Sequence, residues 1–131
     1  MSYSDPRPYI YQDTVETDFG AGTGTAWSFK GPSGKKGSLK NIGLHVTETF
    51  ADDTITGKVL VGTTADPNAY GQLEVADTTA ATNAYNNQDD TNAVIADALP
   101  ADTQIEVTYV QATDSGTAAG KGYAYVEVEW Y

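Results

Sequence analysis

The C-terminal segment 121–131 alternates between apolar and polar side chains along its whole length. One row is apolar and ends on an indole, and it consists of Ala124, Val126, Val128 and Trp130. The other row carries tyrosines and glutamates. A period of two is typical of a strand with one face against a core. The segment therefore predicts a strand whose apolar row is buried.

Similar alternation recurs along most of the chain, interrupted by short turns rich in Gly, Pro, Asp and Asn. It predicts strands over residues 27–30, 40–50, 54–62, 71–75, 92–99 and 103–110. The polar segment 76–92 predicts a long loop, with a helical turn around 79–85. Seven to eight short strands without a crossover helix are typical of an antiparallel sheet. The pattern therefore predicts an all-β domain over residues 25–131, a single antiparallel β-sandwich or jelly roll.

The first residues show no periodic element. Three tyrosines, Tyr3, Tyr9 and Tyr11, are interspersed with Pro6 and Pro8, which favour an extended backbone. A glycine-rich stretch at 20–24 follows and resembles a hinge. We therefore expect residues 1–24 to form an extended N-terminal arm that orders against a neighbouring molecule. The same residues lack the charged and apolar regions of a signal peptide.

Composition and charge exclude several classes of function. The 131 residues carry a formal net charge of −11, with Lys and Arg concentrated in the first forty residues. An acidic body repels phosphate, so we expect no nucleic-acid partner. No apolar run is long enough for a membrane helix, so we expect no membrane partner. The absence of cysteine removes disulfides, thiolate metal sites and Cys nucleophiles.

Candidate chemistry is sparse. The single histidine, His45, has Gly and Thr as neighbours on its row, which favours a surface residue over a catalytic one. The glycine-lysine stretch 31–37 lacks the Walker spacing and predicts a turn. Two acidic pairs, Asp52–Asp53 and Asp89–Asp90, offer oxygen ligands for Ca²⁺, and the second is the better candidate. Solvated loop acids remain the default interpretation, so no metal or cofactor is predicted.

The aromatic row of the last strand has three interpretations. Tyr123, Tyr125 and Tyr131 could form the second face of a strand covered on both sides, a sugar-binding platform, or an oligomer interface. Tyrosine is enriched at interfaces, and Glu127 and Glu129 are interleaved on the same row. We therefore favour the oligomer interface.

Several segments together resemble small proteins encoded with the capsid genes of tailed bacteriophages, which decorate or cement the head. The resemblance is carried by WSFKGPSGKKGSLKNIGLHVTETF, VLVGTTADPNAY, ALPADTQIEVTYV and YAYVEVEWY, which lie in that order within residues 25–131. It implies a jelly-roll or β-sandwich module, often trimeric, on the capsid exterior, assembled in the host cytoplasm. The implied partner is the major capsid protein, and no enzymatic activity is implied.

A cement protein needs contact area more than chemistry, because it bridges neighbouring capsid subunits. The arm supplies aromatic and arginine anchors of the kind that dominate interfaces. We therefore expect Tyr3, Arg7, Tyr9 and Tyr11 to bind the capsid.

Two other classes of function fit the same sequence. One is a carbohydrate- or receptor-binding β-sandwich of a tail fibre or adhesin, with Tyr123 and Tyr125 as its platform. The other is a hydrolase that uses paired carboxylates, because a single histidine and no nucleophile motif leave only that chemistry.

Overall fold

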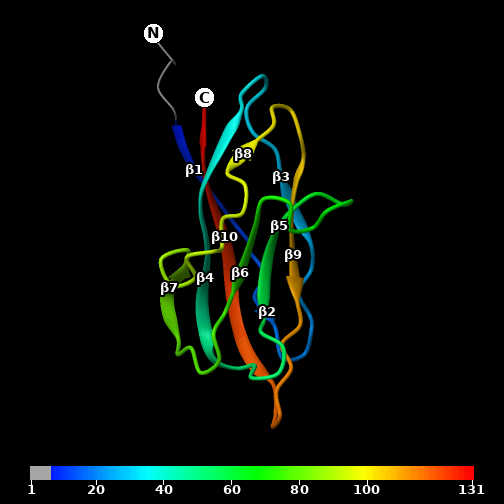
Figure 1. Cartoon of the computed structure of the whole chain (residues 1–131), viewed down its shortest axis with the longest axis vertical. Helices are drawn as coiled ribbons and strands as arrows, with labels where there is room; N and C mark the ends of the chain where they lie inside the picture. Colours follow the sequence, from blue (N-terminus) through cyan, green and yellow to red (C-terminus); the bar gives the residue numbers. More distant parts are fainter. Residues whose placement is uncertain (1–6) are drawn as a thin grey trace.

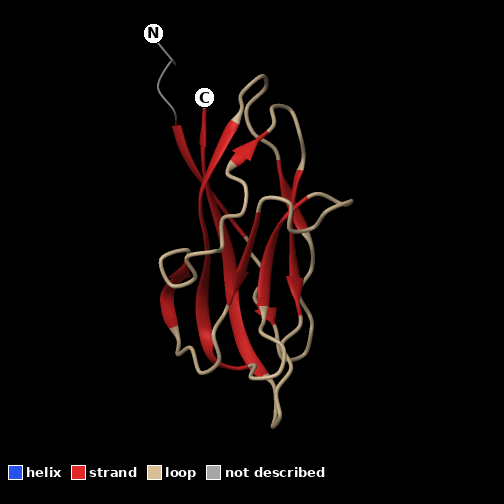
Figure 2. Cartoon of the chain, in the orientation of Figure 1, coloured by secondary structure: helices blue, strands red, loops and turns tan. Residues whose placement is uncertain are grey.

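The computed structural model describes residues 7–131, and for Arg7 the backbone only (Figure 1). The described chain consists of strands and loops without a helix (Figure 2). Two antiparallel sheets pack face to face, which confirms the predicted β-sandwich. No described helix has the length and apolarity required to cross a bilayer.

The larger sheet has the order β1-β10-β4-β7, with β2 added to β10 and β8 added to β4. Its strands are β1 (Arg7–Gln12), β2 (Thr17–Asp18), β4 (Gly37–Ala51), β7 (Thr82–Asn86), β8 (Ala98–Leu99) and β10 (Ala119–Trp130). The smaller sheet has the order β3-β9-β5-β6. Its strands are β3 (Trp27–Phe29), β5 (Lys58–Gly62), β6 (Gly71–Glu74) and β9 (Ile105–Val110).

The core lies between the sheets and is formed by the apolar rows that the alternation predicts. The β10 row is almost completely buried, and Trp130 is only 2% exposed. Strand β4 faces it with Ile42, Leu44 and Val46, and β5 and β9 contribute valines and Ile105 from the other sheet. A register shift beside Glu127 turns Leu39 inward as well. The inward direction of the apolar β10 row is therefore confirmed.

The prediction that residues 1–24 form a separate arm is wrong for the described part of that segment. Strand β1 pairs along its whole length with β10, from Arg7 opposite Trp130 to Gln12 opposite Tyr125. Thr17 and Asp18 pair with the beginning of β10, and Phe19 is 1% exposed in the core. The sandwich therefore begins at β1 and not near residue 25. The physical reason is that β10 has an open edge, and β1 pairs with it.

The predicted helical turn around 79–85 is also wrong. Residues 82–86 form β7, which extends the edge of β4 with Tyr85 opposite Leu44. The Tyr85 ring is buried, and its hydroxyl donates to the Glu74 carbonyl at 2.8 Å. Strands β1, β2 and β7 bring the number of strands within residues 7–131 to ten, where the pattern predicted seven or eight.

Candidate binding face on the larger sheet

The polar row of β10 lies on the outside of the larger sheet. Tyr123 pairs with His45 of β4, and Tyr125 pairs with Gly43. The His45 and Tyr123 rings lie 6.3 Å apart at 66°. The Tyr125 ring covers Gly43 so closely that a Cβ there would overlap the ring. The Tyr125 ring of β10 therefore packs directly against Gly43 of β4.

Strand β1 extends this outer face on the other side of β10. Ile10 is 66% exposed and pairs with Glu127, so it presents apolar surface beside the tyrosines. Two shallow hollows adjoin each other here and share Gln12 and His45. Their other lining residues are Asp13, Thr14 and Tyr123 in one hollow and Ile10, Asn83 and Tyr125 in the other. We call this set of residues the outer face.

The tyrosines predicted to form one interface are divided between two places. Tyr123 and Tyr125 meet on the outer face. Tyr131 is 52% exposed but lies six residues farther along the strand, which corresponds to about 20 Å. Its backbone exchanges two hydrogen bonds with Lys36, at 2.9 and 3.0 Å. Tyr131 therefore belongs to the far end of the sheet.

The predicted capsid-binding residues are not grouped as an arm. Tyr3 lies outside the described residues, and of Arg7 only the backbone pairing with Trp130 is described. Tyr9 is 39% exposed and stacks on Tyr11. Tyr11 points inward, because its ring stacks on Phe29 at 4.3 Å and its hydroxyl accepts a hydrogen bond from Trp130 Nε1 at 3.0 Å. The prediction of Tyr11 as a surface anchor is therefore wrong, since it links the two sheets.

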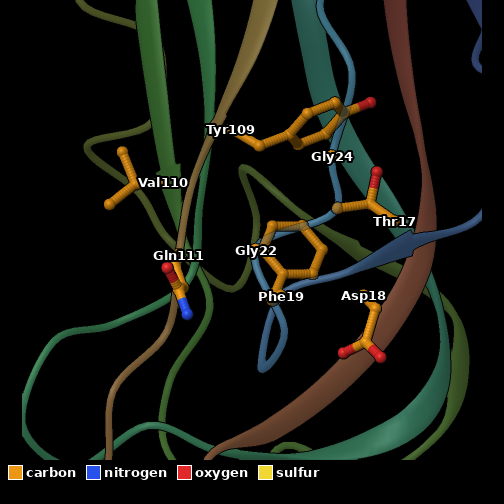
Figure 3. A pocket seen from close by; sticks show the side chains of 8 residues that line it. All are labelled: Thr17, Asp18, Phe19, Gly22, Gly24, Tyr109, Val110 and Gln111. Carbon is orange, nitrogen blue, oxygen red and sulfur yellow. The ribbon is translucent and has the colours of Figure 1, made fainter.

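The best-defined cavity lies elsewhere, between the loop after β2 and strand β9 (Figure 3). Its volume is about 90 Å³, and Phe19 and Tyr109 face it. Binding pockets for small molecules usually measure about 300–1,000 Å³, so this cavity has room for water rather than a substrate.

A buried hydrogen-bond chain passes near this cavity. The Tyr109 hydroxyl donates to Asp13 Oδ2 at 2.6 Å and accepts from Trp27 Nε1 at 2.8 Å. Burial raises the pKa of Tyr109, and the Asp13 carboxylate raises it further. The phenol therefore stays protonated, and the chain fixes the position of the β1–β2 loop.

The Asp89–Asp90 loop, the better of the two calcium candidates in the sequence, has a structural role. Asp89 Oδ2 accepts from the Asn86 N–H at 3.0 Å, and Asp90 Oδ2 accepts from the Glu74 N–H at 2.9 Å. Asp90 Oδ1 accepts from the Asn92 N–H at 3.2 Å. These carboxylates hold the loop after β7 onto β6, and each has a backbone donor as its partner.

The sequence-based interpretation missed the contribution of β1 to the outer face. Ile10 and Gln12 alternate with Tyr9 and Tyr11, and this short alternation was the available signal. The glycine-lysine segment is the predicted turn between β3 and β4, closed by a Lys35 N–H to Pro32 carbonyl hydrogen bond of 3.1 Å. No family model, curated protein or solved structure matches this chain.

Proposed function

We propose that this protein is a non-enzymatic structural protein of a tailed-phage virion, which decorates the capsid exterior and stabilises it by bridging major capsid subunits. The observation that supports the proposal most is the outer face, where Tyr123, Tyr125 and Ile10 lie beside the amide of Gln12 and the imidazole of His45. Tyrosines that lie beside polar side chains on an accessible face are typical of protein interfaces. The sequence resemblance supplies the class of partner.

The rigidity of this face suits a cement protein. The tyrosines stand on the central strand β10, between β1 and β4, and Tyr125 is seated on Gly43. Aromatic side chains that are fixed before binding lose little conformational entropy when the partner arrives. We assign Tyr123 and Tyr125 to the capsid contact in place of the oligomer interface that the sequence favoured. A homotrimer would present this face three times to a shell on which a stable contact buries about 1,600 Å².

Deletion of residues 2–24 is not a suitable test, because it would remove β1, β2 and the core residue Phe19. The better test mixes the full-length protein with expanded heads assembled from the major capsid protein encoded with it, and measures co-sedimentation. We expect the wild type to bind. The double variant Tyr123→Ser/Tyr125→Ser should lose at least about tenfold in affinity, as expected for hot-spot residues.

Tyr131→Ser is the matched control, since it removes an exposed tyrosine of the same strand outside the outer face. It should bind like the wild type. Failure of the wild type to bind heads would refute the proposed function, and equal binding by the double variant would refute the assignment of the face. Native mass measurement checks the trimer directly.

A carbohydrate-binding module is the second candidate, because the hollows combine tyrosine with the side chains of Gln12, Asn83 and Asp13. Aromatic rings beside amide and carboxylate groups are suited to sugar rings and hydroxyls. A glycan array with the wild type and the Tyr123→Ser/Tyr125→Ser variant separates the two candidates. Glycan binding that depends on both tyrosines, without head binding, would favour this alternative.

A further inference from the structure

Three loops meet at one end of the sandwich, away from the C-terminus (Figure 1). They connect β4 to β5, β6 to β7, and β9 to β10. The strand register brings them together, since Ala51 pairs with Ala119, and Lys58 pairs with both Glu74 and Val110. A bridge between Ile55 and Thr113 joins the first loop to the third.

Each of these loops contributes one carboxylate to a common point. Oxygen atoms of Asp53, Asp77 and Asp114 lie within 4.8 Å of one another. Oxygen ligands of one Ca²⁺ lie about 2.3–2.6 Å from the ion, so two ligands on opposite sides are about 4.6–5.2 Å apart. The three carboxylates are therefore close enough to share a single ion.

Backbone donors hold these carboxylates in position. The Asp52 N–H donates to Asp77 Oδ1 at 3.0 Å, and the Asp53 N–H donates to Asp114 Oδ1 at 2.9 Å. Asp53 itself accepts from the N–H and Oγ of Ser115, at 2.7 and 2.6 Å. Donors of one loop therefore orient the carboxylates of another, and each carboxylate keeps lone pairs for a further ligand.

Within the described part of the chain, no ion pair involves Asp53, Asp77 or Asp114. The ion pairs among the described residues are Lys40–Glu129, Lys58–Glu74 and Lys121–Glu48, and none includes an acid of the three loops. Carboxylates this close repel one another, particularly near a protein surface where water is partly excluded.

A fourth carboxyl group lies against the cluster and lacks a partner. Asp52 is 1% exposed, and its Oδ2 accepts from the Gly57 N–H at 2.8 Å, while its Oδ1 has no hydrogen-bond partner. Asp52 directly precedes Asp53 in the chain, and its own N–H donates to Asp77 Oδ1 at 3.0 Å, which places Asp52 beside the cluster. The buried Thr113 Oγ1, next to Asp114, is also unpartnered. Buried polar atoms without partners are rare, and an ion or an ordered water is a usual explanation for them.

We propose that Asp53, Asp77 and Asp114 bind one Ca²⁺, with Asp52 as the buried carboxylate beneath it, and that the ion ties the three loops together. Hard oxygen ligands from three separate loops suit Ca²⁺, whose coordination geometry is adaptable, better than Mg²⁺, which needs shorter bonds and stricter geometry. The sequence led us to expect no metal, and the Asp89–Asp90 loop as the better calcium candidate. The proposed site uses the other acidic pair.

The test is a calorimetric titration of the chelator-stripped full-length protein with CaCl₂, and separately with MgCl₂. We expect one Ca²⁺ per chain, with weaker binding of Mg²⁺. Saturating Ca²⁺ should raise the Tm by several degrees, because the ion binds only the folded chain. Asp77→Asn and Asp114→Asn should each weaken Ca²⁺ binding at least about tenfold.

Asp89→Asn is the matched control, since it removes the charge of a loop aspartate outside the site. It should leave Ca²⁺ affinity within about twofold. Without Ca²⁺, Asp77→Asn should have a Tm equal to or above that of the wild type, because repulsion is relieved. If Asp77 had a purely structural role, Asp77→Asn would instead lower the Tm without Ca²⁺. That result would refute the proposal.

Two results with the wild type would also refute it. One is the absence of binding heat and of any Tm shift at about 10 mM Ca²⁺, which is above the range of weak extracellular calcium modules. The other is a Tm shift of equal size in the wild type, Asp77→Asn and Asp114→Asn, since that would show general charge screening.

Discussion

Five of the nine tyrosines of this protein form two contrasting sets, an inner group of three and an outer pair. The inner group, Tyr11, Tyr85 and Tyr109, packs against the core, and every hydroxyl in it has a hydrogen-bond partner. Burial raises the pKa of all three. The outer pair, Tyr123 and Tyr125, is half-buried on the surface of β10. Among the described residues, no hydrogen bond from another group reaches these two hydroxyls.

The difference shows how one residue type serves two purposes in a small sandwich. The inner tyrosines connect elements that are distant in sequence, as Tyr109 connects Asp13 to Trp27. They fill core volume and satisfy buried donors at the same time. The outer pair leaves both the ring surface and the hydroxyl available to a partner. Changes to the inner group should therefore affect stability, and changes to the outer pair should affect binding.

The largest effect should come from the inner row of β10 itself. Trp130→Ala should reduce the free energy of unfolding by about 3–5 kcal/mol, because a buried indole leaves a cavity and Tyr11 loses its donor. Urea denaturation measures the change. The neighbouring Tyr131→Ala, at an exposed position, should stay within about 0.5 kcal/mol. Similar losses in both variants would contradict the inner–outer division.

The second prediction concerns one hydroxyl of the inner group. Tyr109→Phe keeps the ring but leaves Trp27 Nε1 without its acceptor and Asp13 Oδ2 without its donor, so stability should fall by about 1–3 kcal/mol. Tyr123→Phe is the matched control and should cost less than about 0.5 kcal/mol. Equal costs in the two variants, measured by chemical denaturation, would show that the hydroxyl network contributes nothing.

The third prediction follows from the raised pKa of Tyr109. Above about pH 10 the unfolded chain releases this phenolic proton while the folded chain retains it, so the unfolded state gains stability as the pH rises. The free energy of unfolding should therefore be independent of this group below pH 10. Above pH 10 it should fall by up to about 1.4 kcal/mol per pH unit. Denaturation curves between about pH 9 and 12 measure the slope, which Tyr109→Phe should make shallower. An unchanged slope would assign the alkaline transition to other groups.

The sequence predicted the fold well where alternation and local turns determine it. The apolar row from Ala124 to Trp130 and the rows of β4 and β9 are confirmed, because burial of one face imposes the period of two. Strand β1 was missed, since Pro6 and Pro8 suggested a loose arm and its partner Trp130 lies at the opposite end of the chain. Strand β7 was missed because its pairing with β4 is long-range and its own sequence is polar.

The candidate sites were less accessible to sequence reasoning. Tyr123 and Tyr125 could be recognised from their row, but the contribution of Ile10 and Gln12 depends on the position of β1. The cluster of Asp53, Asp77 and Asp114 could not be predicted from the sequence, because the three residues lie on separate loops and no local spacing links them. In the sequence the pair Asp89–Asp90 was the better calcium candidate, whereas only the fold brings Asp77 and Asp114 to Asp53.

The smallest predicted effect tests how the outer pair is held. Gly43→Ala places a methyl group where the Tyr125 ring lies, so the ring must move, and stability should fall by about 1 kcal/mol. In a Tyr125→Ala background the same methyl group meets open space, and the cost should disappear or reverse. A double-mutant cycle measures this coupling, and Thr47→Ala, an exposed position on β4, serves as the uncoupled control. If Gly43→Ala costs the same in both backgrounds, Tyr125 is not seated on β4, and the rigid outer face loses its structural basis.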